Sequence, residues 1–158
     1  GTDIETNYRL SLSDYGDLNF SLKATYLNKR QYQTNIEFPD IIDEQAGQVG
    51  TPKVRGLFTT VYNLNNLTAS WTVNYIGESD FDNNAVEDQY PEWFNNKVSA
   101  YTYHGINLNY FATEDISIYG GVDNVADKTP PALPNLNSGG SLYDGIGRQY
   151  YAGVKMTF

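Results

Sequence analysis

The densest collection of side chains that could bind a ligand lies between residues 77 and 97, where carboxylates and aromatic rings are interspersed. The five best suited to touch a solute are Asp80, Asp82, Tyr90, Trp93 and Phe94. Aromatic faces in a binding mouth can stack on sugar rings or on the aromatic groups of a siderophore, while carboxylates accept hydrogen bonds from hydroxyl groups. We therefore predict that these five residues are ligand contacts in an exposed loop. The alternative is that the three aromatic residues pack this loop onto the structure beneath it.

Other kinds of chemical site find little support. The run that starts at Asp80 resembles the start of a calcium loop, but Ala85 and Pro91 stand where that loop requires Gly and Glu. The single histidine, His104, has no serine or carboxylate placed around it for nucleophilic catalysis, and alternation puts it on one face with Ile106. The chain has no cysteine, which excludes disulfides and thiolate metal sites. We expect no enzyme activity, no metal and no cofactor.

Composition narrows the class of partner. The 158 residues carry a formal net charge of -9, so a nucleic-acid partner, which needs clustered Lys and Arg, is excluded. Tyr is abundant, with 14 residues, and its apolar ring and polar tip suit half-wetted positions such as membrane interfaces. No stretch approaches the roughly 18 consecutive apolar residues of a membrane helix. Because no basic-then-apolar leader precedes Gly1, we expect a leader or further N-terminal sequence to have been removed.

The elements that must position these residues are strands. Strict alternation of apolar and polar residues recurs in six segments, and helical spacing is nowhere sustained. A seventh segment, residues 53–62, is less regular, because Leu57 and Val61 share a face with Arg55. The pattern predicts an all-β fold in one domain over residues 1–158, an antiparallel up-and-down meander of about seven strands. The six regular segments are residues 3–12, 18–26, 67–75, 105–110, 116–123 and 149–158.

The apolar faces of the six regular segments carry no charged residue. Lipid enforces this strongly, since Arg or Lys at the bilayer midplane costs roughly 2–4 kcal/mol. The connections point the same way: tight turns near residues 13–16, 63–66 and 111–114 alternate with long polar loops over residues 34–52, 77–97 and 124–147. Short turns at one end and long loops at the other are typical of outer-membrane barrels. We therefore expect a transmembrane β-barrel segment, with the last residue on the short-turn, periplasmic side.

Two segments resemble TonB-dependent outer-membrane receptors. The first is GGVDNVADKTPP, residues 120–131, which is similar to the penultimate strand of that family and the loop that follows. The second is YDGIGRQYYAGVKMTF, residues 143–158, which is similar to the last strand. The opening residues 1–5 resemble the start of an ascending strand of the same barrel.

The resemblance implies the C-terminal part of a barrel of about 22 strands, closed by an N-terminal plug, in the outer membrane of a Gram-negative bacterium. Such a receptor takes up a siderophore, carbohydrate or similar solute with energy from the periplasmic TonB protein. The implied partners are outer-membrane lipid, the plug and N-terminal strands, TonB and the barrel assembly machinery. Seven strands cannot close a single-chain barrel, so we predict that these residues alone do not transport.

The last strand carries a second predicted site. Apolar residues alternate back from the C-terminus at Tyr150, Ala152, Val154, Met156 and Phe158. This pattern resembles the signal that the barrel assembly machinery reads, and an unpaired final strand can bind a partner by strand addition. The alternative is that Phe158 merely anchors the strand at the membrane interface.

Two further functions remain open. One is a small self-contained barrel of eight strands, an anchor or adhesin, with one strand missed within residues 34–52 or 77–97. The other is a soluble carbohydrate-binding β-protein with a Tyr-rich face. The sequence does not decide between an iron chelate and a carbohydrate as the ligand.

Overall fold

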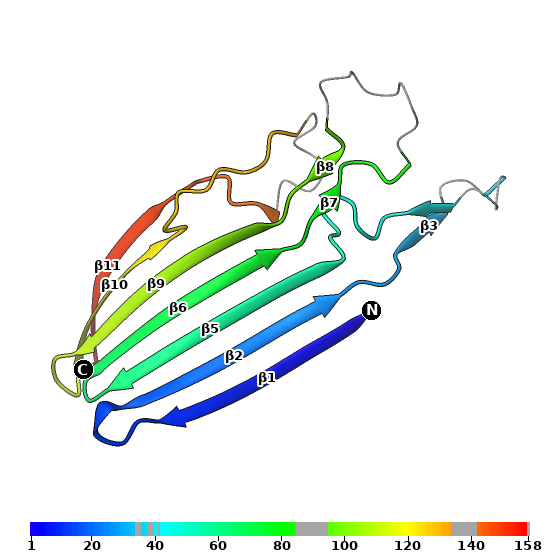
Figure 1. Ribbon diagram of the computed structural model, residues 1–158. Helices are drawn as coiled ribbons and strands as arrows, with labels where there is room; N and C mark the ends of the chain where they lie inside the picture. Colours follow the sequence, from blue (N-terminus) through cyan, green and yellow to red (C-terminus); the bar gives the residue numbers. More distant parts are fainter. Residues whose placement is uncertain (34–35, 38–39, 41, 85–94, 134–141, 158) are drawn as a thin grey trace.

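A computed structural model describes residues 1–33, 36–37, 40, 42–84, 95–133 and 142–157. Seven long strands form one antiparallel sheet in sequential order (Figure 1). This confirms the predicted all-β meander. The strands are β1 (Thr2–Ser11), β2 (Asp17–Tyr26), β5 (Val54–Leu64), β6 (Leu67–Ile76), β9 (Tyr101–Phe111), β10 (Ile116–Asp123) and β11 (Gln149–Met156).

Four short strands lie in the long connections. β3 (Gln31–Gln33) pairs with β4 (Ile42–Glu44), and β7 (Ser79–Asp80) pairs with β8 (Lys97–Val98). Both pairs form sheets of their own, so within the described residues neither region adds an eighth strand to the main sheet. No helix in the described part of the chain is long and apolar enough to cross a lipid bilayer; the single helical element is the 3-10 turn η1 (Ser13–Tyr15).

Two sequence expectations need correction. β9 begins at Tyr101, four residues earlier than predicted, because residues 101–104 also pair with β6. These residues alternate, but Tyr101 and Tyr103 fall on the polar face. The opening strand also runs opposite to the expected direction. Since the order is sequential and antiparallel, β1 and β11 point the same way, from the end with the long connections to the end with the short turns (Figure 1).

The pairing register places the predicted faces side by side across the whole sheet. One row joins Tyr8, Phe20, Thr60, Trp71, Ile106, Val122 and Tyr150, and we call their side the apolar face. The neighbouring row joins Arg9, Asn19, Val61, Ser70, Asn107, Gly121 and Tyr151 on the polar face. The register explains the irregular β5: Phe58 lies on the apolar face opposite Leu22 and Val73, so Leu57 and Val61 fall beside Arg55.

The short turns depend on residues with positive φ. Gly16 has φ 89°, and a Cβ there would collide with the carbonyl oxygen of Asn63 in β5, so only glycine fits. Asn65 has φ 49° in the two-residue connection between Leu64 and Leu67, a conformation that Asn tolerates well. These turns fix the register at the short-turn end of β2, β5 and β6.

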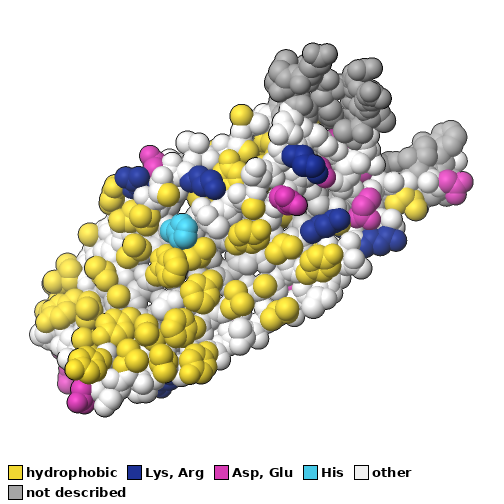
Figure 2. All heavy atoms as spheres, in the orientation of Figure 1, with side chains coloured by type: hydrophobic (Ala, Val, Ile, Leu, Met, Phe, Trp, Pro, Cys, Tyr) yellow, Lys and Arg dark blue, Asp and Glu magenta, His cyan; other side chains and the backbone are white. Residues whose placement is uncertain are grey.

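No described element forms a second layer over the apolar face. Side chains such as Tyr8, Ile118 and Val154 are 62%, 51% and 56% exposed, and Figure 2 shows a broad apolar field over the strands. An apolar surface this large on a folded protein marks a site that contacts lipid or another protein. A row of rings crosses the face, in which Tyr8, Phe20, Phe58, Trp71 and His104 are each about 6 Å from the next centroid.

The buried core lies instead at the end with the long connections. Val49, Ile76, Val98, Tyr103 and Tyr143 form one cluster, with Ile76 fully buried. These residues come from β6, β8, β9 and the connections 45–53 and 124–148. The three long connections are therefore packed onto one another and onto the outer ends of β6 and β9.

Candidate binding concavity

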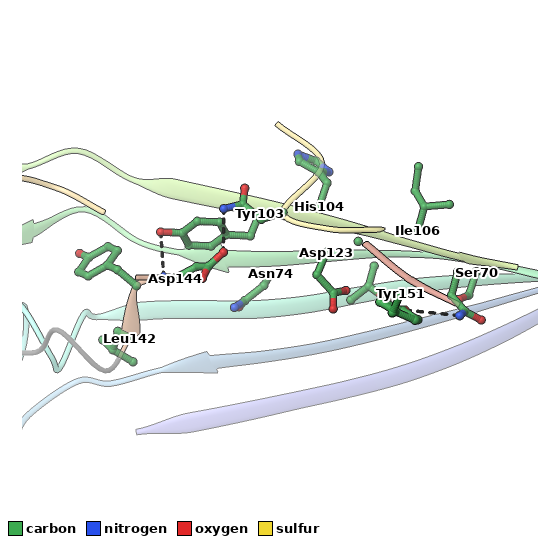
Figure 3. A pocket seen from close by; sticks show the side chains of 14 residues that line it. Ser70, Asn74, Tyr103, His104, Ile106, Asp123, Leu142, Asp144 and Tyr151 are labelled. Atoms are coloured by element: carbon green, nitrogen blue, oxygen red, sulfur yellow. Dashed lines mark hydrogen bonds between the residues drawn. The ribbon is translucent and has the colours of Figure 1, made fainter. Parts of the chain in front are cut away.

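A concavity of about 510 Å³ opens on the polar face beside this core. Its floor is made by β6, β9, β10 and β11, and its outer wall by residues 142–144 (Figure 3). This volume is within the range of pockets that bind small ligands, roughly 300–1,000 Å³. The lining side chains that face it include Ser70, Thr72, Asn74, Tyr103, Asn107, Asp123, Asp144 and Tyr151.

The alternation of the strands explains this lining. Ser70, Thr72 and Asn74 occupy every second position of β6, and Tyr103, Gly105 and Asn107 do the same on β9. Because residues i and i+2 of a strand point to the same side, these polar residues all face the concavity. His104 and Ile106 contribute only their strand, since their side chains point away from it in Figure 3.

Gly105 lines the concavity without a side chain, and Gly121 leaves room for the Tyr151 ring that lines it. Gly105 and Gly121 lie on neighbouring strands, and the ring of Tyr151 lies over Gly121. A Cβ on Gly121 would lie 2.5 Å from the ring atom Cζ of Tyr151 and 2.7 Å from the carbonyl oxygen of Ile106. Asn107 Nδ2 donates to the Tyr151 hydroxyl at 3.4 Å and to the Gly120 carbonyl at 3.3 Å. The Tyr151 ring thus packs against Gly121, is held by Asn107 and lines the concavity.

The outer wall is attached by the buried Asn124, at the end of β10. Its Nδ2 donates to Asp144 Oδ2 at 2.7 Å and to the Lys128 carbonyl at 3.0 Å, and its Oδ1 accepts the Lys128 amide at 2.9 Å. The Tyr103 hydroxyl accepts the amide of Asp144 at 3.2 Å. One amide side chain therefore ties the start of the last long connection to its end.

Asp144 is a positioning residue of this wall. Its Oδ1 accepts the amides of Ile146 and Gly147 at 3.0 and 3.3 Å. The Ile146 amide is the main cause that lowers the pKa of Asp144, with the bonds from Asn124 and Gly147 adding to it. Hydrogen bonds to the ionised form favour that form, so Asp144 is a carboxylate at neutral pH.

The electrostatic character of the concavity is neutral to negative. Among the described residues that line it are two carboxylates, Asp123 and Asp144, and neither Lys nor Arg. Asp123 lies 3.2 Å from where a Gly105 Cβ would stand. Within the described residues, the side chains of Asp123 and Asn74 make no hydrogen bond, so both can bind a solute. The same residues contain no group of three or more His, Cys, Asp or Glu arranged to hold a metal ion.

The predicted loop contacts are only partly visible. Asp80 Oδ1 pairs with Lys97 Nζ at 2.8 Å, and the Asp80 carbonyl accepts the Val49 amide at 2.9 Å. Asp82 exchanges bonds with Asn96, and its Oδ1 accepts the amide of Asn84. Both carboxylates therefore hold the second long connection together, and the backbone carbonyl of Asp80 joins it to the first. Tyr90, Trp93 and Phe94 lie outside the described residues, so the ligand-contact role of the five stays a prediction.

The last strand, β11, has its apolar residues on one face, as the alternation predicted. Tyr150, Ala152, Val154 and Met156 share the apolar side of β11, and Tyr150 is 72% exposed. β11 pairs with β10 on one side, and no other described strand occupies its second edge. Phe158 lies outside the described residues. A role in barrel assembly stays a prediction.

The residues of the concavity were missed by sequence reasoning. The alternation predicted a polar face on β6 and β9, but nothing in the sequence pointed to the wall at residues 142–144, which Asn124 brings back across 20 residues of chain. One available signal was the motif DNVADK, because Asn124 and Asp127 both have positive φ and mark a constrained turn.

Solved structures identify the fold. A variant of the ferric enterobactin receptor PfeA of Pseudomonas aeruginosa matches 98% of this chain at 22% identity with a TM-score of 0.67, and another variant gives 0.65. The siderophore receptor PirA of Acinetobacter baumannii matches 99% of this chain at 16% identity with a TM-score of 0.53. The chain spans 22% of the PfeA chains and 32% of PirA. No protein-family model and no curated protein matches the sequence.

These matches confirm the fold predicted from the residues. The seven-stranded sheet has the fold of the barrel part of TonB-dependent receptors. The two proteins it resembles are a ferric enterobactin receptor and a siderophore receptor.

Proposed function

We propose that this chain is the C-terminal wall of an outer-membrane receptor that takes up a scarce solute with energy from a periplasmic TonB partner. The observation that carries the proposal is the division of the sheet into two faces. Its apolar face is exposed and carries no charge over the regular strands, while its polar face holds a concavity beside the long connections. A water-facing lumen and a lipid-facing exterior require this division.

The two ends of the sheet fit the proposed orientation. The short-turn end has three tight connections, and the other end has the long connections that pack into the buried core. Receptors bind solutes from outside the cell, so the concavity lies at the end where a solute would enter. The open edges of β1 and β11 would be paired by further strands of the same barrel, since unpaired backbone groups in lipid cost several kcal/mol each.

The alternatives fit these observations less well. A self-contained barrel of eight strands needs a strand that the described residues do not add to the sheet. A soluble β-protein would have to cover the apolar face, and no described element packs on it.

The proposal is tested with the whole protein that contains this chain, expressed in a Gram-negative host with and without its TonB protein. We expect the protein in the outer-membrane fraction and solute accumulation that requires TonB. Recovery of the protein in the soluble fraction, or accumulation that does not depend on TonB, would refute the proposal.

A further inference from the structure

The chemistry of the concavity bears on which solute is taken up. Its lining combines hydroxyl groups from Ser, Thr and Tyr, amides from Asn, and carboxylates, without any cation. Such groups donate and accept hydrogen bonds but offer no positive charge to an anion. The inference drawn below about the solute rests on the proposed function, because it concerns the ligand of the same receptor.

We propose that the concavity binds a neutral, polyhydroxylated solute, an oligosaccharide of uncharged sugar units, and not an anionic iron chelate. The free carboxylate of Asp123 and the amide of Asn74 lie on the outer half of the floor. A carboxylate can accept hydrogen bonds from two sugar hydroxyls at once, and an amide both donates and accepts. These two side chains supply the polar contacts.

Tyr151 supplies the apolar contact. Its ring packs against Gly121, is 39% exposed, and lines the concavity. Sugar rings present faces of C–H groups, which pack on the face of an aromatic ring and release water. The packing against Gly121 and the contact from Asn107 fix this ring in place before a ligand arrives, which lowers the entropic cost of binding.

The surrounding charge argues against a ferric catecholate. Three catecholate dianions outweigh one Fe³⁺, so the chelate is an anion, and it would meet the carboxylates of Asp123 and Asp144. The long connections at this end, residues 27–53, 77–100 and 124–148, hold twelve acidic and six basic residues. The two basic residues of the last connection each contact a tyrosine. Lys128 Nζ lies 4.1 Å from the centroid of the Tyr101 ring, and Arg148 donates a hydrogen bond to the Tyr150 hydroxyl. Like charges at a binding surface lower affinity and slow association.

The first experiment measures binding to the whole protein purified in detergent. The probes are a printed array of neutral plant, algal and bacterial oligosaccharides and, in separate titrations, ferric enterobactin. We expect binding to at least one class of neutral oligosaccharide and none to ferric enterobactin. Binding of ferric enterobactin, or no binding anywhere on the array, would overturn the proposal.

The second experiment assigns the binding to this concavity. Asp123→Ala is compared with Val122→Ala, the adjacent position of β10 whose side chain is on the apolar face. Loss of hydrogen bonds to a charged group should weaken oligosaccharide binding about tenfold or more in Asp123→Ala, and Val122→Ala should bind like the parent. Asp123→Asn preserves the shape and should lose less. Equal affinities in all three folded variants would overturn the assignment.

Binding and uptake separate the two proposals. If the protein imports a ferric siderophore in a TonB-dependent way, the receptor function stands and the oligosaccharide assignment fails. If it binds oligosaccharide in detergent but gives no TonB-dependent uptake in cells, the assignment stands and the transport function fails.

Discussion

The ring of Tyr151 lies directly over Gly121, its paired residue on the neighbouring strand. A reciprocal pair lies next to it, where Tyr119 of β10 covers Gly153 of β11, so the two strands exchange a tyrosine and a glycine. A strand glycine lacks a side chain to pack, and an aromatic ring across it restores the buried surface. These two pairs join the last two strands on the polar face, and Tyr151 lines the concavity.

A side chain at Gly121 should therefore destabilise the protein. Gly121→Ala would place a Cβ 2.7 Å from the Ile106 carbonyl oxygen, which cannot swing away as a side chain can. Overpacking of this kind costs about 1–3 kcal/mol. The measurement is the midpoint of thermal unfolding of the whole receptor in detergent. Gly56→Ala is the matched control, because a Cβ there meets its nearest neighbours at 3.8 Å; equal midpoints for both variants would contradict the packing argument.

The assignment of faces predicts an asymmetric effect of charge in β2. Leu22 is on the apolar face near the middle of the strand, and Ser21 beside it is on the polar face. Leu22→Arg should lower the yield of folded protein in lipid vesicles, since a midplane arginine costs roughly 2–4 kcal/mol, whereas Ser21→Arg should fold like the parent. A gel-shift assay of heat-modifiable mobility reports the folded fraction. A larger loss from Ser21→Arg would show that the faces are reversed.

Acid should loosen the wall of the concavity. The pKa of Asp144 is lowered in the folded protein, first by the Ile146 amide, so its carboxylate contributes stability above its unfolded pKa of about 4, and that contribution is lost as pH falls through the folded value. Hydrogen exchange of the Ile146 and Gly147 amides, corrected for the intrinsic pH dependence, should therefore rise below about pH 4. In Asp144→Asn the exchange should be faster at neutral pH and independent of pH in this range. Parent protection that is constant down to pH 2 would be inconsistent with the assigned bonds.

Loss of the last residue should impair assembly of the receptor and leave its affinity for solute unchanged. Deleting Phe158 from the whole receptor should reduce the amount of folded protein in the outer membrane, because the assembly machinery is proposed to read the apolar alternation that ends there. Receptor that does reach the membrane should keep its affinity for solute. Normal membrane levels of the truncated protein would show that Phe158 is only an interface anchor.

Much of the fold was predictable because its signal is local. Alternation in segments such as residues 18–26 predicts both a strand and its lipid-facing side, and the lengths of the connections give the order of strands. The early start of β9 at Tyr101 was missed since Tyr101 and Tyr103 place aromatic rings on the face that is polar in the rest of the strand. The direction of β1 was misjudged because the likeness of residues 1–5 to an ascending strand outweighed the parity of the strand count.

The binding concavity was much harder to predict, since its parts meet only in the folded chain. The bond from Asn124 to Asp144 spans 20 residues, and that from Asp144 to Tyr103 spans 41. Asp80 and Asp82 were predicted as ligand contacts from their type alone, and loop packing uses both carboxylates. The exchange of Tyr and Gly between β10 and β11 was present in the sequence at positions 119, 121, 151 and 153, and its meaning depended on the register.

The central claim is that one face of this sheet meets lipid and the other meets water. These 158 residues have no cysteine, so in the whole receptor, with any cysteine elsewhere replaced by serine, single spin labels are placed at each position from 104 to 110 of β9 and the protein is reconstituted in liposomes. Power-saturation measurements should give high accessibility to oxygen at positions 104, 106, 108 and 110 and high accessibility to a water-soluble nickel complex at positions 105, 107 and 109. Labels that show no alternation, or the opposite one, would contradict the account.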